Sequence, residues 1–340
     1  MPKIATALIG CGGRGPQGHA KVALASDGLE LIAVCDIDER RAKLVGEKFG
    51  VEHVTDYHQL LIRNDIESVI IATGTKQHGP IAVDAAHAKK HILIEKPLVD
   101  FVSTGKDLIK AVEESGVIGL VGYQQRFTAF TQRLKQEASK IEPLQTLMTV
   151  QRGLLRPPYF VPEHYGGIID TATHTIHQAL WIMDDIPSGV YSTLRRGTFT
   201  KDQTIGYANL MIDYDNGART STIITSMGSV QVPNVIQIIG KYGTINSSNR
   251  KTLQVAKHQG FDLNDRQPIG LETQTIDLDE TSYNPIAEMH SHFANLINGE
   301  EKEQRGTTLR EGLLAVVVTE AMALSAERGQ RVLLAEVMNQ

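Results

Sequence analysis

A glycine-rich turn close to the start is the feature that most constrains how this chain can fold. The apolar run at residues 4–9 leads directly into Gly10-Cys11-Gly12-Gly13-Arg14-Gly15, which has the spacing G-x-G-x-x-G. Glycines at this spacing allow a tight turn between a strand and a helix, and they let a pyrophosphate approach the amides that open the helix. About 20 residues further on, Asp36 ends a second apolar run, where an acidic residue binds the adenosine ribose. The turn and Asp36 therefore predict dinucleotide binding; a glycine-rich turn without a cofactor is the alternative.

The charge around Asp36 favours NAD over NADP. A carboxylate at this place accepts hydrogen bonds from the ribose hydroxyls and repels a 2′-phosphate, and Asp38 adds a second negative charge. Arg40 and Arg41 follow closely and are long enough to reach a 2′-phosphate, so NADP stays open. A plainer interpretation of Asp36 is that it only caps the next helix.

The first 123 residues alternate between short apolar runs and longer stretches of helical period. The runs predicted as strands are residues 4–9, 31–35, 69–72, 92–94 and 117–121. The stretches predicted as helices are residues 18–26, 38–49, 57–62, 80–89 and 102–115. Short strands that are apolar throughout are typical of a parallel sheet covered on both faces. We therefore expect residues 1–123 to form an α/β Rossmann domain, a doubly wound parallel sheet that binds ligands at its carboxyl edge.

The pattern changes after residue 124. Two helical stretches are followed by alternating segments typical of strands: the helices are 127–141 and 174–183, and the strands are 190–199, 205–214, 218–227 and 232–239. Between two of these strands, Asp215-Asn216-Gly217 favours a hairpin turn, because Asn and Gly tolerate positive φ. We expect residues 124–304 to form an α+β domain with a large, mostly antiparallel open sheet and a helix or two on one face. Helices are also expected at 286–297 and 309–327, with residues 305–340 packing back on the Rossmann domain.

Composition and charge argue against several kinds of partner. Lys and Arg number 34 against 39 Asp and Glu, a formal charge of −5, and no basic block is present of the kind that binds a phosphate backbone. The two cysteines, Cys11 and Cys35, fit reduced thiols in a cytoplasmic protein. No run of about 18 apolar residues occurs. We therefore expect a small-molecule substrate and neither a nucleic-acid nor a membrane partner.

A lysine is expected at the carboxyl edge of the predicted parallel sheet. The strand predicted at residues 92–94 ends in Glu95-Lys96-Pro97, where the proline stops the strand and restricts the residue before it. An ammonium group there is placed to hydrogen-bond a substrate oxygen and to stabilise developing alkoxide charge. A solvated surface lysine is the plainer interpretation.

Asp170, His174 and His177 are predicted to share one face of a helix, because they are spaced i, i+4 and i+7. A carboxylate beside an imidazole fixes its tautomer and raises its basicity, which suits proton removal from an alcohol. Alternatively, the Asp caps the helix and the histidines form hydrogen bonds in the core. A zinc or manganese site is a third interpretation, but no fourth ligand is evident and the cation of Lys96 would compete, so no metal is expected.

These motifs in this order resemble the Gfo/Idh/MocA family of oxidoreductases, which includes glucose-fructose oxidoreductase and inositol dehydrogenase. The resemblance covers almost the whole chain and includes the loop from Thr73 through His78. This chain differs at two places. His177 stands where many members have an Asp, and Thr73-Gly74-Thr75 stands where Thr-Pro-Asn is common. The first difference leaves the substrate open, because one carboxylate is missing from the substrate face.

The resemblance implies roles for individual residues. Lys96, Asp170 and His174 are expected to be catalytic. The residues expected to bind the cofactor are Gly10, Gly12, Gly13, Arg14, Gly15, Asp36, Thr73, Thr75, His78, Glu95 and Lys96. Those expected to shape the substrate pocket are Arg126, Tyr159, His164, Tyr165, His177 and Tyr283, for each of which ordinary packing or surface exposure is the alternative.

The implied activity is hydride transfer between NAD(P) and a secondary alcohol or ketone of a sugar, cyclitol or related polyol. Two other functions stay open. Some similar proteins hydrolyse glycosides while recycling NAD, and a non-catalytic NAD sensor would use the same fold. Similar proteins also pair through the open sheet, which has one apolar face, so a homodimer or homotetramer is expected.

Overall fold

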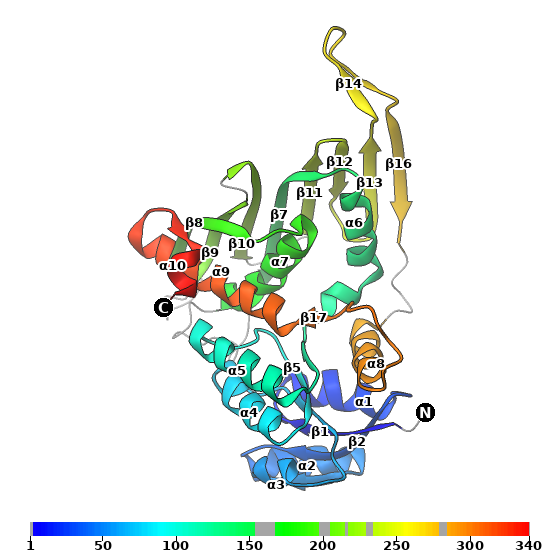
Figure 1. The fold of residues 1–340 in the computed structure, drawn as a ribbon, viewed down its shortest axis with the longest axis vertical. Helices are drawn as coiled ribbons and strands as arrows, with labels where there is room; N and C mark the ends of the chain where they lie inside the picture. Colours follow the sequence, from blue (N-terminus) through cyan, green and yellow to red (C-terminus); the bar gives the residue numbers. More distant parts are fainter. Residues whose placement is uncertain are drawn as a thin grey trace. The chain divides into compact units, whose positions relative to one another are not determined.

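The computed structural model describes residues 3–153, 167–196, 205–214, 217–228, 234–278 and 284–339 (Figure 1). The chain divides into two compact units. The first consists of Met1–Phe127 and Asn284–Val316, and the second of Thr128–Tyr283 and Val317–Gln340.

The first unit contains a seven-stranded sheet in the order β17-β6-β5-β4-β1-β2-β3. Its strands are β1 (Ile4–Ile9), β2 (Leu29–Cys35), β3 (Glu52–Val54), β4 (Ser68–Ile71), β5 (His91–Ile94), β6 (Gly119–Val121) and β17 (Thr307–Thr308). All neighbours pair in parallel except β17 and β6. This confirms the predicted Rossmann-type sheet. Only β3 and β17 have no counterpart in the sequence prediction, because a strand of two or three residues has no measurable apolar period.

The helices of the first unit cover both faces of this sheet. They are η1 (Gly15–Ala20), α1 (Lys21–Leu24), α2 (Glu39–Phe49), α3 (His58–Leu61), α4 (Thr75–His87), α5 (Val102–Ser115), η2 (Gln124–Phe127) and α8 (Pro285–Ile297). Helices α1, α2 and α8 pack on β2, while α4 packs on β4 and β5 and also against α5. The predicted helix at 18–26 begins earlier and differs in kind, because η1 is a π-helix that opens directly from the glycine turn. Helix α4 also begins before the predicted residue 80 and carries Pro80 in its interior.

Helix α8 belongs to the first unit, whereas the expected boundaries assign residues 124–304 to the second domain. The reason is packing: Met289, Phe293 and Ala294 are fully buried in the same apolar cluster as Leu8 and Leu29. Burying this helix face completes the core on the β2 side of the sheet.

The second unit contains a nine-stranded sheet in the order β16-β13-β12-β11-β7-β10-β9-β8-β18. Its strands are β7 (Pro143–Gly153), β8 (Pro187–Arg196), β9 (Ile205–Tyr214), β10 (Arg219–Gly228), β11 (Val235–Gly240), β12 (Gly243–Ser247), β13 (Thr252–Lys257), β16 (Glu272–Asp277) and β18 (Val332–Leu333). All neighbouring pairs are antiparallel except β7 and β10, which confirms the mostly antiparallel sheet. Strands β9 and β10 pair as the predicted hairpin requires, with Tyr214 opposite Arg219; residues 215 and 216 lie outside the described part.

The strands missed by the sequence analysis are β7, β12, β13, β16 and β18, together with the hairpin of β14 (Gly260–Asp262) and β15 (Gln267–Ile269). Figure 1 shows this hairpin as a projection between β13 and β16. The strands missed by the sequence analysis carry many Thr, Gln and Asn residues. The contrast between their apolar and polar positions is therefore weak, which hides the strand period.

One face of this sheet is covered by α7 (Gly167–Met183), which packs on β7, β9 and β10 and also contacts α6 (Ala129–Ser139). Helix α9 (Leu309–Arg328) begins in the first unit and ends in the second. The expectation that residues 305–340 all pack back on the Rossmann domain differs from the structure. Strand β18 extends the second sheet beside β8, and α10 (Leu334–Met338) also packs on β8, because their apolar side chains Val332, Leu334 and Val337 are buried there. Within the described residues, none of the helices has the length and apolar character needed to cross a membrane.

Candidate active site

The glycine turn follows β1 directly, and the fold itself requires two of its glycines. Gly10 has φ +107°, a left-handed conformation, and a Cβ there would lie 2.5 Å from the carbonyl oxygen of Ala72. A Cβ on Gly15 would lie 2.0 Å from the carbonyl oxygen of Gly10. The tight turn and the close packing of strand on helix predicted from the sequence are therefore present.

Gly12 lies in open space. Apart from its two neighbours in the chain, no heavy atom of the described residues comes within 4 Å of a Cβ built at this position, and the φ of Gly12 is outside the left-handed region. Neither the backbone nor the packing of the chain therefore demands glycine here. A group outside the chain that must approach the backbone closely, as a pyrophosphate does, would account for it. The turn thus fits a dinucleotide.

Asp36 follows β2 and ties that strand end to the turn. Its Oδ2 accepts a hydrogen bond from the amide of Cys11 at 2.8 Å, and its Oδ1 accepts one from the amide of Asp38 at 2.9 Å. Each carboxylate oxygen can accept a further hydrogen bond from a ribose hydroxyl. The Nε atoms of Arg40 and Arg41 lie 3.8 and 3.5 Å from the Asp38 carboxylate. The negative charge of Asp38 therefore offsets part of the positive charge that the two arginines would offer to a 2′-phosphate.

The thiols near this turn are inert. Cys11 and Cys35 are both free and buried. Burial, followed by the negative charge of Asp36, raises the pKa of each thiol to about 12, so neither is a thiolate at neutral pH.

The loop after β4 joins two strand ends of the sheet. Thr73 lies in this loop, and Thr75 begins α4. His78 is buried, with Nδ1 2.9 Å from the carbonyl oxygen of Pro97 and Nε2 3.2 Å from that of Thr73. Burial lowers the pKa of His78, although its contacts with backbone carbonyls oppose the shift, and the ring positions the loop by lying between Thr73 and Pro97.

Strand β5 ends immediately before Glu95 and Lys96, as predicted. The amide of Glu95 bonds to the carbonyl of Ile71, which continues the sheet by one residue, and the Lys96–Pro97 bond is cis. Glu95 is buried, and its Oε2 accepts a hydrogen bond from the amide of Lys96 at 3.0 Å. The structure therefore brings Glu95 and Lys96 to the sheet edge that also carries the glycine turn, with Arg14 Nε 3.5 Å from Glu95 Oε1.

The sequence analysis missed two buried histidines, His19 and His290, that are linked to Glu95 by hydrogen bonds. His19 lies in η1 and bonds to Glu95, and His290 lies in α8 and bonds to His19. Their only signal in the sequence is a histidine in a segment that is otherwise small or apolar, which is equally typical of a core histidine.

Asp170, His174 and His177 all lie in α7 of the second unit, as the helical spacing predicts. His174 and His177 are buried. Nothing is described of the Asp170 side chain, and Tyr159, His164, Tyr165 and Tyr283 lie outside the described residues. A cluster of three or more His, Cys, Asp or Glu side chains suited to a metal does not occur in the described part of the chain.

Arg126 lies in η2 and its guanidinium is engaged within the first unit. Its NH1 donates to Oε1 of Glu311 at 2.7 Å, and the side chain is 7% exposed. This ion pair joins η2 to the first turn of α9. Its expected contact with substrate stays a prediction.

Comparison with known proteins follows the same division of the chain. Residues 4–123 match the Gfo/Idh/MocA family model described as an oxidoreductase family with an NAD-binding Rossmann fold, and residues 147–334 match the model of its C-terminal alpha/beta domain. D-apiose dehydrogenase of Rhizobium rhizogenes (strain K84) is 27% identical over 98% of each chain. Myo-inositol 2-dehydrogenase of Thermotoga maritima is 27% identical over 94% of this chain and 96% of that protein.

The fold is also found among solved structures. The structure of an oxidoreductase from Agrobacterium radiobacter in complex with NAD+, L-tartaric acid and magnesium matches with a TM-score of 0.82 and 23% identity, over 98% of this chain and 99% of that chain. The chain matches the models of both domains in this order, and the two relatives named above match it over nearly their whole length. The chain belongs to the Gfo/Idh/MocA family of oxidoreductases, and its Rossmann domain is of the NAD-binding type.

Proposed function

We propose that this enzyme is an NAD-dependent dehydrogenase that acts on a secondary alcohol or ketone of a sugar, cyclitol or related polyol. The observation that carries the proposal is that a lysine, Lys96, lies just after the end of β5 in the same unit whose glycine turn leaves open space at Gly12. The two relatives of the same length are named for a sugar and a cyclitol, D-apiose and myo-inositol, which supports the substrate class.

In the proposed mechanism the chain handles the proton and the oxygen of the substrate. His174, oriented by Asp170, accepts the hydroxyl proton. Lys96 donates a hydrogen bond to the same oxygen and stabilises its developing negative charge. NAD, when bound, supplies the nicotinamide C4 that accepts the hydride. In the reverse direction, His174 protonates the alkoxide while Lys96 holds it.

NAD is favoured over NADP by the charge at the end of β2. Asp36 presents a fixed carboxylate there, and Arg40 and Arg41 are each close to Asp38. A 2′-phosphate would meet Asp36 first, so binding of NADP carries a repulsion that NAD avoids.

The test is absorbance of reduced nicotinamide with NAD and then NADP, against inositols, aldoses, sugar acids and simple glycosides. Growth of the band with one polyol class supports the proposal and identifies the substrate class. His174→Asn and Lys96→Met are expected to lower kcat by on the order of 100-fold or more while the protein still binds NAD. Full turnover in either variant refutes the role given to that residue.

Two outcomes of this assay point to other functions. Release of an aglycone from a glycoside without net reduction of NAD would establish the NAD-recycling hydrolase. Tight NAD binding with neither reaction across the panel would establish the sensor.

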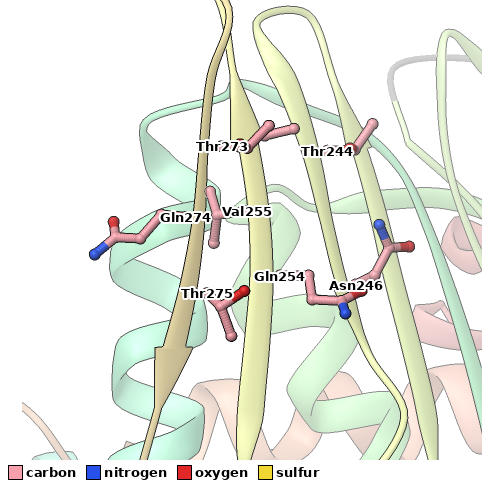
Figure 2. Close-up of a pocket in the computed structure, with 8 residues that line it drawn as sticks. Thr244, Asn246, Gln254, Val255, Thr273, Gln274 and Thr275 are labelled. Atoms are coloured by element: carbon pink, nitrogen blue, oxygen red, sulfur yellow. The ribbon is translucent and has the colours of Figure 1, made fainter.

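We also propose that the protein forms a homodimer or homotetramer through the sheet face opposite α7. The paired registers place a set of uncharged residues on that face across β7, β10, β11 and β12. They are Gln145, Leu147, Thr149, Gln151, Thr220, Thr222, Ile224, Ser226, Val235, Gln237, Ile239, Thr244 and Asn246. Figure 2 shows a hollow at one end of this face, lined among others by Thr244, Asn246, Gln254 and Thr275.

The size of this face fits a second copy of the chain. The four strands lie about 4.8 Å apart and carry up to four residues each on this face at a spacing of about 6.8 Å, so they cover roughly 500 Å², enough for the core of an interface that buries approximately 800 Å² per partner. A face of this size without central charges is unusual on a monomer, because charged residues are depleted at interface cores and enriched on free surfaces.

A further inference from the structure

A buried chain of three polar side chains ends at the residue before Lys96. Nε2 of His19 lies 2.9 Å from Oε1 of Glu95, and Nδ1 of His19 lies 3.0 Å from Nε2 of His290. Both imidazoles are fully buried and Glu95 is 6% exposed. The imidazole rings of His19 and His290 meet edge to edge through the contact of Nδ1 with Nε2, with their centroids 5.3 Å apart and their planes 20° apart.

The direction of the first hydrogen bond follows from the charge of Glu95. Burial by itself would raise the pKa of this carboxyl, but the hydrogen bond from His19 and the charges of His19, Arg14 and Lys96 lower it below its ordinary value. An ionised carboxylate only accepts hydrogen bonds. His19 therefore carries a hydrogen on Nε2, and this N–H donates a hydrogen bond to Oε1 of Glu95.

His290 holds His19 in that orientation. Burial, followed by the charge of His19, places the pKa of His290 well below its ordinary value, so this imidazole is neutral. Its Nε2 meets His19, while its Nδ1 is buried and has no hydrogen-bond partner among the described residues. An unsatisfied buried nitrogen costs about 1–3 kcal/mol, which an apolar side chain at this position would avoid.

Glu95 in turn connects the two parts of the site in the first unit. Its Oε2 accepts from the amide of Lys96, and its Oε1 meets both His19 and Arg14 of the glycine turn. Without His19, this carboxylate loses its fully buried hydrogen-bond donor and, among the described residues, keeps the half-exposed Arg14 and the Lys96 amide. The side chain would then be free to turn toward Arg14 and solvent, and the backbone at Lys96 would lose its restraint.

We propose that His19, held by His290, is a positioning residue that fixes Glu95 and thereby couples the glycine turn to Lys96. The expected effect on kcat rests on the proposed function, since it assigns Lys96 a place in the chemistry. The expected effect on NAD affinity rests only on the glycine turn. An error of about 1 Å in the placement of a catalytic group costs on the order of 100-fold in rate, which makes such a support necessary.

The test compares two amide substitutions that differ in reach. In His19→Gln the amide nitrogen lies near the former Nε2 and can still donate to Glu95. In His19→Asn it lies near the former Nδ1, so it can meet His290 and cannot reach Glu95. Both side chains are polar and smaller than histidine, so their cost to packing is similar.

The measurements are the NAD affinity by calorimetry, kcat and KM for the polyol, and Tm. His19→Asn is expected to lower kcat by on the order of 100-fold with little change in the KM for the polyol, and to weaken NAD binding. His19→Gln is expected to retain both. The matched control is His292→Gln, because His292 is an equally buried histidine on the same helix as His290 that bonds to the amide of Gly306 instead.

A purely structural role predicts a different pattern. All three variants would lose Tm, and none would change kcat or NAD affinity per folded molecule; that result overturns the inference. Equal loss of activity in His19→Gln and His19→Asn overturns it as well.

Lys96→Met, measured in parallel, separates this inference from the proposed function. If Lys96→Met keeps full turnover, the catalytic role of Lys96 fails, and His19 is then judged by NAD affinity alone. If Lys96→Met is inactive while His19→Asn matches the wild type in both kcat and NAD affinity, the positioning role fails and the proposed function stands.

Discussion

Gly12 and Gly15 lie three residues apart in the same turn, and the chain constrains them differently. At Gly15 a side chain would collide with the backbone of Gly10, whereas at Gly12 it would meet open space. The sequence motif treats the two glycines alike. Only the three-dimensional structure separates Gly15, which the fold needs, from Gly12, which the fold leaves free to vary.

This difference predicts opposite effects of the same substitution. Gly12→Ala is expected to leave Tm within about 1 °C of the wild type, since nothing is displaced, and to weaken NAD binding by about tenfold or more because the methyl group occupies the approach of the pyrophosphate. Calorimetric titration with NAD and differential scanning calorimetry measure the two quantities.

Gly15→Ala is the matched control. Its Cβ would meet the carbonyl oxygen of Gly10 at 2.0 Å, so it is expected to destabilise the first unit by about 3 kcal/mol or more. A Gly12→Ala protein that binds NAD as tightly as the wild type would show that the open space is not part of the cofactor site.

At the scale of secondary-structure elements, one buried carboxylate joins α6 to β13. Glu137 is 1% exposed, and its Oε1 meets Arg133 Nε at 3.0 Å and Lys140 Nζ at 2.8 Å, both on or next to α6. Its Oε2 meets Lys257 Nζ of β13 at 3.2 Å. The three cations keep contact with water, while the carboxylate depends on them entirely.

Glu137→Gln is therefore expected to destabilise the protein by about 2 kcal/mol, less than for a fully buried pair because the cations can be hydrated. Glu47→Gln is the control, since Glu47 makes only an exposed pair with Lys43 at 3.9 Å and is expected to change stability by less than about 0.5 kcal/mol. Urea unfolding followed by circular dichroism measures both. Equal stability of the two variants would contradict the role of Glu137.

The same carboxylate predicts a pH dependence. Burial would raise the pKa of Glu137, but its hydrogen bonds and the charges of Lys140 and Lys257 lower it below the ordinary value of 4.5. The unfolded chain therefore binds the proton more readily. The stabilisation from this site is complete above about pH 4.5 and is lost as the pH falls below that value, so the gap between wild type and Glu137→Gln should narrow there.

At the scale of the whole molecule, the uncharged sheet face predicts the state of assembly. The wild type is expected to have a mass of two or four times the 37.3 kDa of the chain. Ile224→Lys places a charge in the middle of this face, where desolvating it is costly, and is expected to give single chains. Size-exclusion chromatography with light scattering measures the mass.

Leu44→Lys is the control for that experiment. Leu44 is an exposed leucine of α2 in the first unit, so the variant adds the same charge away from the sheet. It is expected to assemble like the wild type. A wild-type mass of 37.3 kDa at micromolar concentration would refute the proposed assembly.

The sequence by itself determined the features that depend on neighbours along the chain. The apolar run at residues 4–9 and the alternating segment at 205–214 coincide with β1 and β9, and the helix predicted at 102–115 coincides with α5, because strand and helix periods are local properties. The glycine turn, Asp36, Lys96 and the helical spacing of His174 and His177 were also predictable, since each follows a strand or lies within one helix.

Only the tertiary structure decided the contacts between distant parts of the chain. His19 and His290 are separated by 271 positions, and α8 completes a core that begins at Ile4. A partner at that separation leaves no period or spacing in the sequence, because its identity depends on which surfaces the folded chain brings together. The same reason accounts for β18 joining β8, and for the different constraints on Gly12 and Gly15.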